Sequence, residues 1–396
     1  MTLENLQGSR REAGSRNGGP VLTQRLRFIK PTLPPLESVV AAYQPAYASG
    51  VITNADVVKK FEASAREALE VKHAVAVSSC TSGLMLTFRA LGLKGAVIVP
   101  SFTFFATAHA VVWNGLRPVF ADCDPETWTI DPADVERRID EHTSAIVGVH
   151  MYGNPCDIEA LSRLAEKYKL KLIFDAAHAF GSRLQSRAIG QFGDAEVFSL
   201  SPTKLLVAGE GGLVATNDSL LAEKIRLGRN YGDSGDYDPE ILGLNARMSE
   251  FNAALALAGM DLLSRKLQRH NEIAERYTKR LSGIPGISFQ AIRRGNLSGY
   301  KDFSVCIDAQ AFGRTRDEVA ALLAAQNIDT KRYFYPPLHQ QKLYSHFYRP
   351  SDGGLTHTEY VSGGVLSLPI YESLSDETVD IVASALEQVA EREAVR

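Results

Sequence analysis

The sequence predicts an α/β fold with a mainly parallel sheet, followed by a smaller α+β region. Short apolar runs alternate with helical patterns in the first half of the chain, at residues 97–100, 118–122, 145–150 and 172–175. Strands that alternate with helices form parallel sheets covered on both faces. Ligands of such sheets bind beyond the carboxyl ends of the strands. Polar residues at these ends are therefore the candidates for a functional site.

The composition is that of an ordinary globular chain. Its 396 residues are 45% hydrophobic and 22% charged, and the net charge of -3 implies no attraction to nucleic acid or to a membrane surface. No apolar run reaches the roughly 20 residues of a membrane span. The four cysteines form no CxxC pair, which argues against a zinc site and a disulfide framework. We therefore expect a cytoplasmic protein without a bound metal.

Three regions are expected along the chain. Residues 1–20 are rich in Gly, Ser and Arg and lack the apolar core of a secretory signal, which predicts a disordered tail. Residues 21–263 carry the alternating strands and helices and predict a large domain, and residues 264–396 predict a small α+β domain. The elements expected in the small domain are strands at residues 303–307 and 366–368 and helices at residues 316–326 and 376–391.

The stretch at residues 172–212 carries the strongest chemical signal. One apolar run ends at Asp175, a second ends near Ser199, and Lys204 follows before a glycine-rich segment. Taken singly, such an aspartate caps a turn and such a lysine is solvated. Together they fit pyridoxal phosphate (PLP). This cofactor needs a lysine amine for its attachment, a carboxylate for its pyridine nitrogen, and hydroxyl and N–H groups for its phosphate.

Three motifs in this stretch resemble the DegT/DnrJ/StrS-type sugar (nucleotide-sugar) aminotransferases, a branch of the fold-type I PLP enzymes. They are Asp-Ala-Ala-His-Ala at residues 175–179, Phe-Ser-Leu-Ser-Pro-Thr-Lys at residues 198–204 and Gly-Glu-Gly-Gly at residues 209–212. The resemblance covers nearly all of the chain from about Pro31 onward. It implies a mainly parallel seven-stranded sheet flanked by helices, a smaller α+β domain at the carboxyl end, and Lys204 as the catalytic residue that carries PLP.

Thr81 and Ser82 are candidates for binding the phosphate of PLP. They lie between a predicted strand at residues 74–78 and a predicted helix at residues 84–91. Small hydroxyl residues at a helix N-terminus predict an anion site, because free N–H groups and the helix dipole both favour phosphate. Plain N-capping is the alternative. Asp175 and Lys204 favour phosphate binding, and the resemblance adds Ser199 as a further phosphate ligand.

The resemblance assigns roles to further single residues. It implies that Phe104 stacks on the cofactor ring and that His178 contacts the ring hydroxyl. It also implies that Tyr335 and His339 lie beside the substrate, although packing at the boundary between the domains is an alternative for both.

Asn245 has a different role in the resemblance. The corresponding asparagine of the family reaches the phosphate of the neighbouring subunit's cofactor, so we expect a homodimer with shared active sites. The sequence departs from the family beside this residue, where Ala246 replaces a tyrosine, and at Asn54-Ala55, where the family usually has a glycine.

These residues predict the transfer of an amino group from an amino acid, with L-glutamate as the expected donor, to a keto sugar that the resemblance implies is nucleotide-linked. Lys204 would move the proton at the reacting carbon, and Asp175 would keep the pyridine nitrogen protonated.

Alternatives from other classes stay open. One is another PLP-dependent reaction on the same fold. Sugar dehydration would have His in place of Lys204, decarboxylation is possible on this fold, and desulfuration would need a reactive cysteine in a mobile loop. The other alternative is a PLP-binding regulator without turnover, for which no basic helix-turn-helix stretch is visible.

Overall fold

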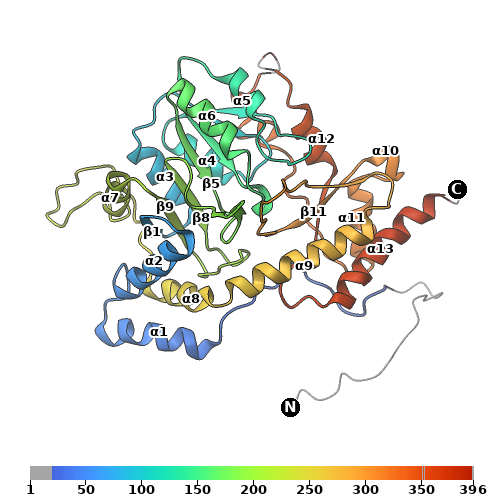
Figure 1. Ribbon diagram of the computed structural model, residues 1–396, viewed down its shortest axis with the longest axis horizontal. Coiled ribbons are helices and arrows are strands. Elements are labelled where there is room, and N and C mark those ends of the chain that lie inside the picture. Colours follow the sequence, from blue (N-terminus) through green and yellow to red (C-terminus); the bar gives the residue numbers. More distant parts are fainter. Residues whose placement is uncertain (1–19, 350, 352, 395–396) are drawn as a thin grey trace.

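The computed structural model describes residues 20–349, 351 and 353–394, and it has two parts that lie side by side (Figure 1). A seven-stranded sheet flanked by helices forms the first part, and a three-stranded sheet with long helices forms the second. The tail predicted at residues 1–20 lies outside the described residues except for its last position.

The large sheet is mainly parallel, which confirms the fold class predicted from the sequence. The five strands from β3 to β8 in the sheet order run parallel, and β9 runs antiparallel to both of its neighbours. The order across the sheet is β1 (His73–Val77), β9 (Gly212–Thr216), β8 (Ala195–Ser199), β5 (Lys171–Asp175), β4 (Thr143–Val149), β2 (Ala96–Pro100) and β3 (Arg117–Ala121).

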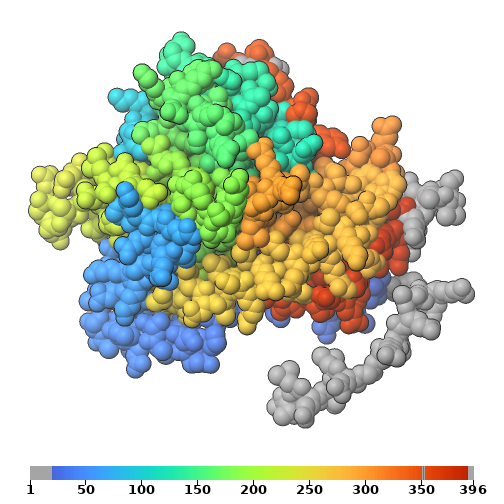
Figure 2. Space-filling view, in the orientation of Figure 1, coloured from blue at the N-terminus to red at the C-terminus, as the bar shows by residue number. Residues whose placement is uncertain are grey.

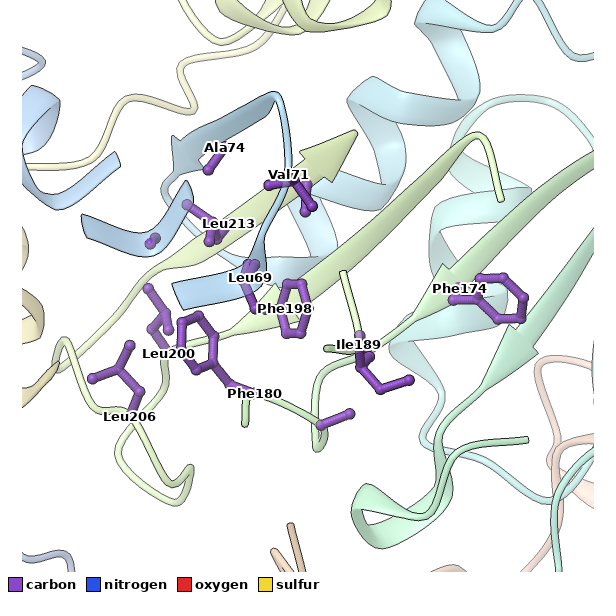
Figure 3. Close-up of a cluster of buried hydrophobic side chains, with 14 of the residues drawn as sticks. Leu69, Val71, Ala74, Phe174, Phe180, Ile189, Phe198, Leu200, Leu206 and Leu213 are labelled. Carbon is purple, nitrogen blue, oxygen red and sulfur yellow. The ribbon is translucent and has the colours of Figure 1, made fainter. Parts of the chain in front are cut away.

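Helices cover both faces of this sheet. Side chains alternate along a strand, so β1 directs Ala74 to one core and Val75 to the other. Figure 3 shows part of the first core, where Phe198 of β8 packs edge-on against Phe180. The first face packs against α1 (Leu36–Ser49), α2 (Asp56–Leu69), α5 (Pro132–Arg138), α6 (Ile158–Tyr168) and α8 (Glu250–Met260), and the second against α3 (Cys80–Ala90), α4 (Ala106–Trp113) and α7 (Ser219–Gly228).

The second part is an α+β unit around three antiparallel strands, in the order β10 (Ile287–Phe289), β11 (Phe303–Ile307) and β12 (Val365–Leu368). Its longest helices, α9 (Leu263–Leu281) and α13 (Asp376–Ala394), are joined by ion pairs such as Arg276–Asp380. Figure 1 shows α9 running from the large sheet to α13. The remaining elements are α10 (Ala309–Phe312), α11 (Arg316–Ala325), α12 (Thr356–Gly364), the hairpin β6 (Arg183–Leu184) and β7 (Arg187–Ala188), and the short 3-10 turns at Met151–Gly153, Leu338–Gln340 and Ser345–Phe347.

Two segments pack across the boundary predicted at residue 263. Leu26 pairs with Ile328 and packs on the core of the second part. In the other direction, Leu338 and Tyr344 pack into the core of the large sheet. The two parts are in direct contact, as the orange and green regions of Figure 2 show. Among the described helices, none is both long enough and apolar enough to cross a membrane.

A carboxylate from α8 fixes the start of α2. Glu250 is fully buried and accepts hydrogen bonds from the amides of Ala55 and Val57, both at 2.7 Å, and of Val58 at 3.2 Å. The preceding Asn54 has a φ of 52°, in the left-handed region that asparagine tolerates better than most residues. This explains an asparagine where the resembled family usually has a glycine.

We expect Glu250→Ala to lower the free energy of unfolding by about 2–3 kcal/mol, because it leaves three amides at the start of α2 without their acceptor. Urea unfolding followed by circular dichroism measures the loss. The matched control is Glu37→Ala, which removes an exposed glutamate from the first turn of α1 and should change stability by less than about 0.5 kcal/mol. Equal losses in the two variants would contradict this role of Glu250.

Candidate active site

A cavity of about 270 Å³ lies at the carboxyl ends of the strands of the large sheet. The position agrees with the rule for ligand binding to such sheets. Six of the predicted site residues line it, and they are Thr81, Phe104, Asp175, His178, Ser199 and Lys204. The four that do not line it are Ser82, Asn245, Tyr335 and His339.

Lys204 lies in the turn that follows β8, where its amide donates to the carbonyl of Ser201 at 3.0 Å. Burial of its amine lowers the pKa of Lys204 to about 8, and the positive charge of nearby Lys301 acts in the same direction. Asp302 and Asp175 oppose this shift. The lowered pKa therefore leaves roughly a fifth of Lys204 as the neutral amine at pH 7.4, far more than for an exposed lysine. The neutral amine is the form that reacts with carbonyl carbons and accepts protons.

Asp175 ends β5 and is held in place by hydrogen bonds on both oxygens. Thr107 of α4 donates its hydroxyl to Oδ2 at 2.7 Å, and the amide of Ala177 donates to Oδ1 at 3.1 Å. The thiol of Cys80 lies 3.8 Å from Oδ1, and burial next to this carboxylate raises the pKa of Cys80 well above its ordinary value. Cys80 is thus a packed, neutral thiol. Sequence reasoning missed Thr107, whose signal was a small hydroxyl residue on a helix beside the predicted site.

The hydroxyls of Thr81, Ser199 and Ser201 line the cavity near the N-terminus of α3. Ser199 and Ser201 lie with their Oγ atoms 3.4 Å apart. Ser82 has a different position, because its hydroxyl and the hydroxyl of Ser79 form the capping box of α3. The alternative of N-capping therefore describes the Ser82 side chain, while Thr81 is left to face the cavity.

His178 has a single tautomer that suits a hydrogen-bond donor. The amide of Tyr152 donates to Nδ1 at 3.2 Å, so the ring proton is on Nε2. Burial and the charges of Lys204 and Lys301 hold the pKa of His178 well below its ordinary value. The imidazole is therefore neutral, and it lies stacked with Phe334 at 6.2 Å between ring centroids.

Aromatic rings form the opposite wall of the cavity. Phe104 is 43% exposed and lies against Phe105, with ring centroids 3.9 Å apart. Phe334 lies 5.8 Å from Phe104, and Tyr333 completes the wall. Flat aromatic rings of this kind can stack on a planar ligand in the cavity.

The segment at residues 332–339 does reach the cavity, but through different side chains from those expected. Tyr333 and Phe334 line it, whereas the ring of Tyr335 lies under the guanidinium of Arg316 at 4.7 Å. His339 is buried, with Nδ1 2.7 Å from Ser101 Oγ and Nε2 3.1 Å from Glu359. His339 is therefore packed, whereas Tyr335 is half exposed, because the chain turns at Tyr333 and Phe334. Contact of either residue with substrate stays a prediction.

Asn245 does not line the cavity. It is exposed and forms a backbone bridge with Asn230, while the next residue, Ala246, is fully buried. The backbone carbonyl of Ala246 accepts from the amide of Ser78 at 2.8 Å. This contact ties the Asn245 segment to the loop that leads into α3.

The residues of the cavity fit PLP. A buried amine, a buried carboxylate, a donor imidazole and three hydroxyls face one space, and these are the groups that the cofactor's carbonyl, pyridine nitrogen, ring hydroxyl and phosphate require. Gly211 also lines this space, and a Cβ atom there would come within 2.6 Å of Met248, so a larger side chain would crowd the wall.

Comparison with known proteins shows the family of this chain. The chain matches the DegT/DnrJ/EryC1/StrS aminotransferase family over residues 37–387. It is 34% identical over 361 residues to dTDP-4-amino-4,6-dideoxy-D-glucose transaminase of Shigella dysenteriae, and the match covers 91% of this chain and 98% of that protein. The spore coat polysaccharide biosynthesis protein SpsC of Bacillus subtilis is 34% identical over 356 residues, covering 86% of this chain and 91% of that protein.

Among solved structures, DesI in the presence of its TDP-sugar product is similar, with a TM-score of 0.90, 37% identity and 95% of each chain covered. The resemblance inferred from the sequence motifs is thus confirmed. Because the family match and these relatives span nearly the whole chain, this protein belongs to the DegT/DnrJ/EryC1/StrS aminotransferase family, and it is an aminotransferase.

Proposed function

We propose that this aminotransferase uses PLP and moves an amino group from an amino acid, with L-glutamate as the expected donor, to a keto sugar carried on a nucleotide. The observation that carries the proposal is the position of Lys204 and Asp175 in one cavity with the hydroxyls of Thr81 and Ser199. Two similar proteins support the acceptor class, since one is named for a dTDP-amino sugar and the other was crystallised with a TDP-sugar product.

When bound, PLP supplies an electron sink for the negative charge that develops at the substrate carbon. The residues of this chain supply the rest. Lys204 accepts the proton from the donor's α-carbon and returns it during product formation, since burial lowers the pKa of its amine to about 8 and so raises the fraction that can accept a proton. Asp175, fixed by Thr107, pairs with the pyridine nitrogen. The Nε2–H of His178 donates to the ring hydroxyl.

The rival reactions have less support. A lysine at position 204 argues against the sugar-dehydrating branch, which has a histidine there. All four cysteines are buried, so no exposed thiol is offered for desulfuration. The cavity with a buried amine whose pKa is lowered to about 8 favours turnover over a purely regulatory role.

The test is the donor half-reaction. The holoenzyme mixed with L-glutamate and no sugar should release close to one equivalent of 2-oxoglutarate per subunit, while the visible absorbance of the bound cofactor moves to shorter wavelength. Lys204→Ala should lose at least about 10³-fold in this rate, because the proton acceptor is gone. Lys59→Ala, an exposed lysine of α2, is the control and should keep the wild-type rate. Wild-type release of 2-oxoglutarate by Lys204→Ala would sink the proposal.

We also infer a homodimer in which each active site is completed by the partner. Asn245 is exposed on its own subunit, away from the cavity. Large apolar side chains are exposed on α1, including Leu36 at 70% and Tyr47 at 75%, and a second copy would cover them. A phosphate ligand that comes from the partner would make dimerisation a condition for activity.

Mixing two inactive variants tests this inference. Asn245→Asp should be inactive because its carboxylate repels the phosphate, and Lys204→Ala lacks its amine. When equal amounts are unfolded together and refolded, one site of each mixed dimer has both Lys204 and Asn245. About a quarter of the wild-type activity should return. Absence of any recovery, with mixed dimers demonstrated by mass spectrometry, would show that Asn245 serves only its own subunit.

A further inference from the structure

A second buried lysine lies beside Lys204. Lys301 stands just before β11, in the carboxyl-terminal part, and only 4% of its surface is exposed. It lines the active-site cavity and also a smaller hollow of about 20 Å³ on the other side of Lys204. The two spaces share only Thr203, Lys204 and Lys301 among their lining residues. Thr203, Lys204 and Lys301 therefore border both spaces.

Three contacts fix the position of Lys301. Its Nζ lies 2.8 and 3.0 Å from the two oxygens of Asp302, which is itself buried. The ring of Tyr333 lies 5.1 Å from the same atom, and aromatic faces attract cations. The backbone amide of Lys301 donates to the carbonyl of Tyr152 at 2.8 Å, which ties this loop to the large sheet. The ammonium is thus held at one place in the site.

A positive charge beside Lys204 would favour the proposed reaction. Lys204 needs its lone pair both to attach the cofactor and to accept a proton, and a protonated amine has none. A positive charge close by disfavours protonation of a buried amine. The other titratable groups that face Lys204 are Asp302, Asp175 and Cys80, which favour its protonated form when charged, and the neutral His178.

We propose that Lys301 is a positioning residue that acts through Lys204: held by Asp302, it places a positive charge beside the Lys204 amine and so raises the fraction of that amine that is unprotonated and reactive. This rests on the proposed use of Lys204 with PLP. The carboxyl-terminal part of the chain thereby takes part in the chemistry of an amine that belongs to the large sheet.

The experiment titrates Lys204 directly in the full-length chain stripped of PLP. Trace acetylation with acetic anhydride at a series of pH values, followed by mass spectrometry of the peptide that contains Lys204, gives the pH at which half of the amine is protonated. The wild-type midpoint is expected at about 8. Lys301→Met should raise it by about one pH unit, so that labelling at pH 7.5 falls roughly tenfold.

Three further variants make the result specific. Lys301→Arg keeps the charge and should keep the wild-type midpoint. Lys301→Gln keeps a donor for Asp302 without the charge, so it should shift the midpoint as Lys301→Met does, and it replaces that variant if the latter does not fold. Lys266→Met is the matched control, because it removes another buried lysine of the smaller hollow, one that contacts the carbonyl of Leu205 at 3.1 Å. Its midpoint should stay at the wild-type value.

An unchanged midpoint in the uncharged Lys301 variants would overturn the proposal, as would an equal shift in Lys301→Arg or in Lys266→Met. A loss of sugar affinity in Lys301→Met with an unchanged midpoint would also overturn it, since Lys301 would then act on the substrate. The titration contains no sugar and no amino donor. Failure of the proposed PLP-dependent transfer from L-glutamate would therefore leave its outcome unaffected and show separately in the donor half-reaction.

Discussion

The parallel pairing of β5 with β8 is the constraint on which the rest of the site depends. Asp175, the last residue of β5, pairs with Val197 of β8, and β8 ends two residues later at Ser199. Both strands therefore end at the same edge of the sheet. The carboxyl ends of parallel strands meet at one edge of the sheet. Polar side chains that follow these ends can form a binding site there without disrupting the strand pairing. The turn after β8, closed by the hydrogen bond from the Lys204 amide to Ser201, then brings Lys204 to the cavity that Asp175 also lines. Strand pairing and this turn together place the amine and the carboxylate in one cavity.

Placing charges in this edge has an energetic cost. Lys204, Asp175, Lys301 and Asp302 are all removed from water, and a buried charge is tolerated only with close partners. Asp302 binds Lys301 through both oxygens, and Thr107 binds Asp175. Lys204 alone has no such fixed partner, and its lowered pKa is the result. The charges around Lys204 are thus stabilised by partners, while the amine of Lys204 itself is left reactive.

The second part of the chain completes the site, although it has its own sheet and core. It contributes Lys301, Tyr333 and Phe334 to the cavity. Buried contacts hold these side chains at the large sheet, notably the pairing of His339 with Ser101 just after β2. His339 therefore anchors the segment that lines the cavity, and a displacement of this segment would also displace Phe334.

The sequence by itself determined the alternation of strands and helices, the positions of Asp175, Ser199 and Lys204 at strand ends, and the hydroxyl-rich start of α3. These are local patterns, because hydrophobic periodicity, turn residues and helix caps each depend on a few neighbouring positions. Only the tertiary structure decided that Thr107 binds Asp175, that Phe334 rather than Tyr335 faces the cavity, and that Lys301 lies beside Lys204. These contacts join residues far apart in the chain, and their partners are chosen by packing between layers, which no local pattern contains.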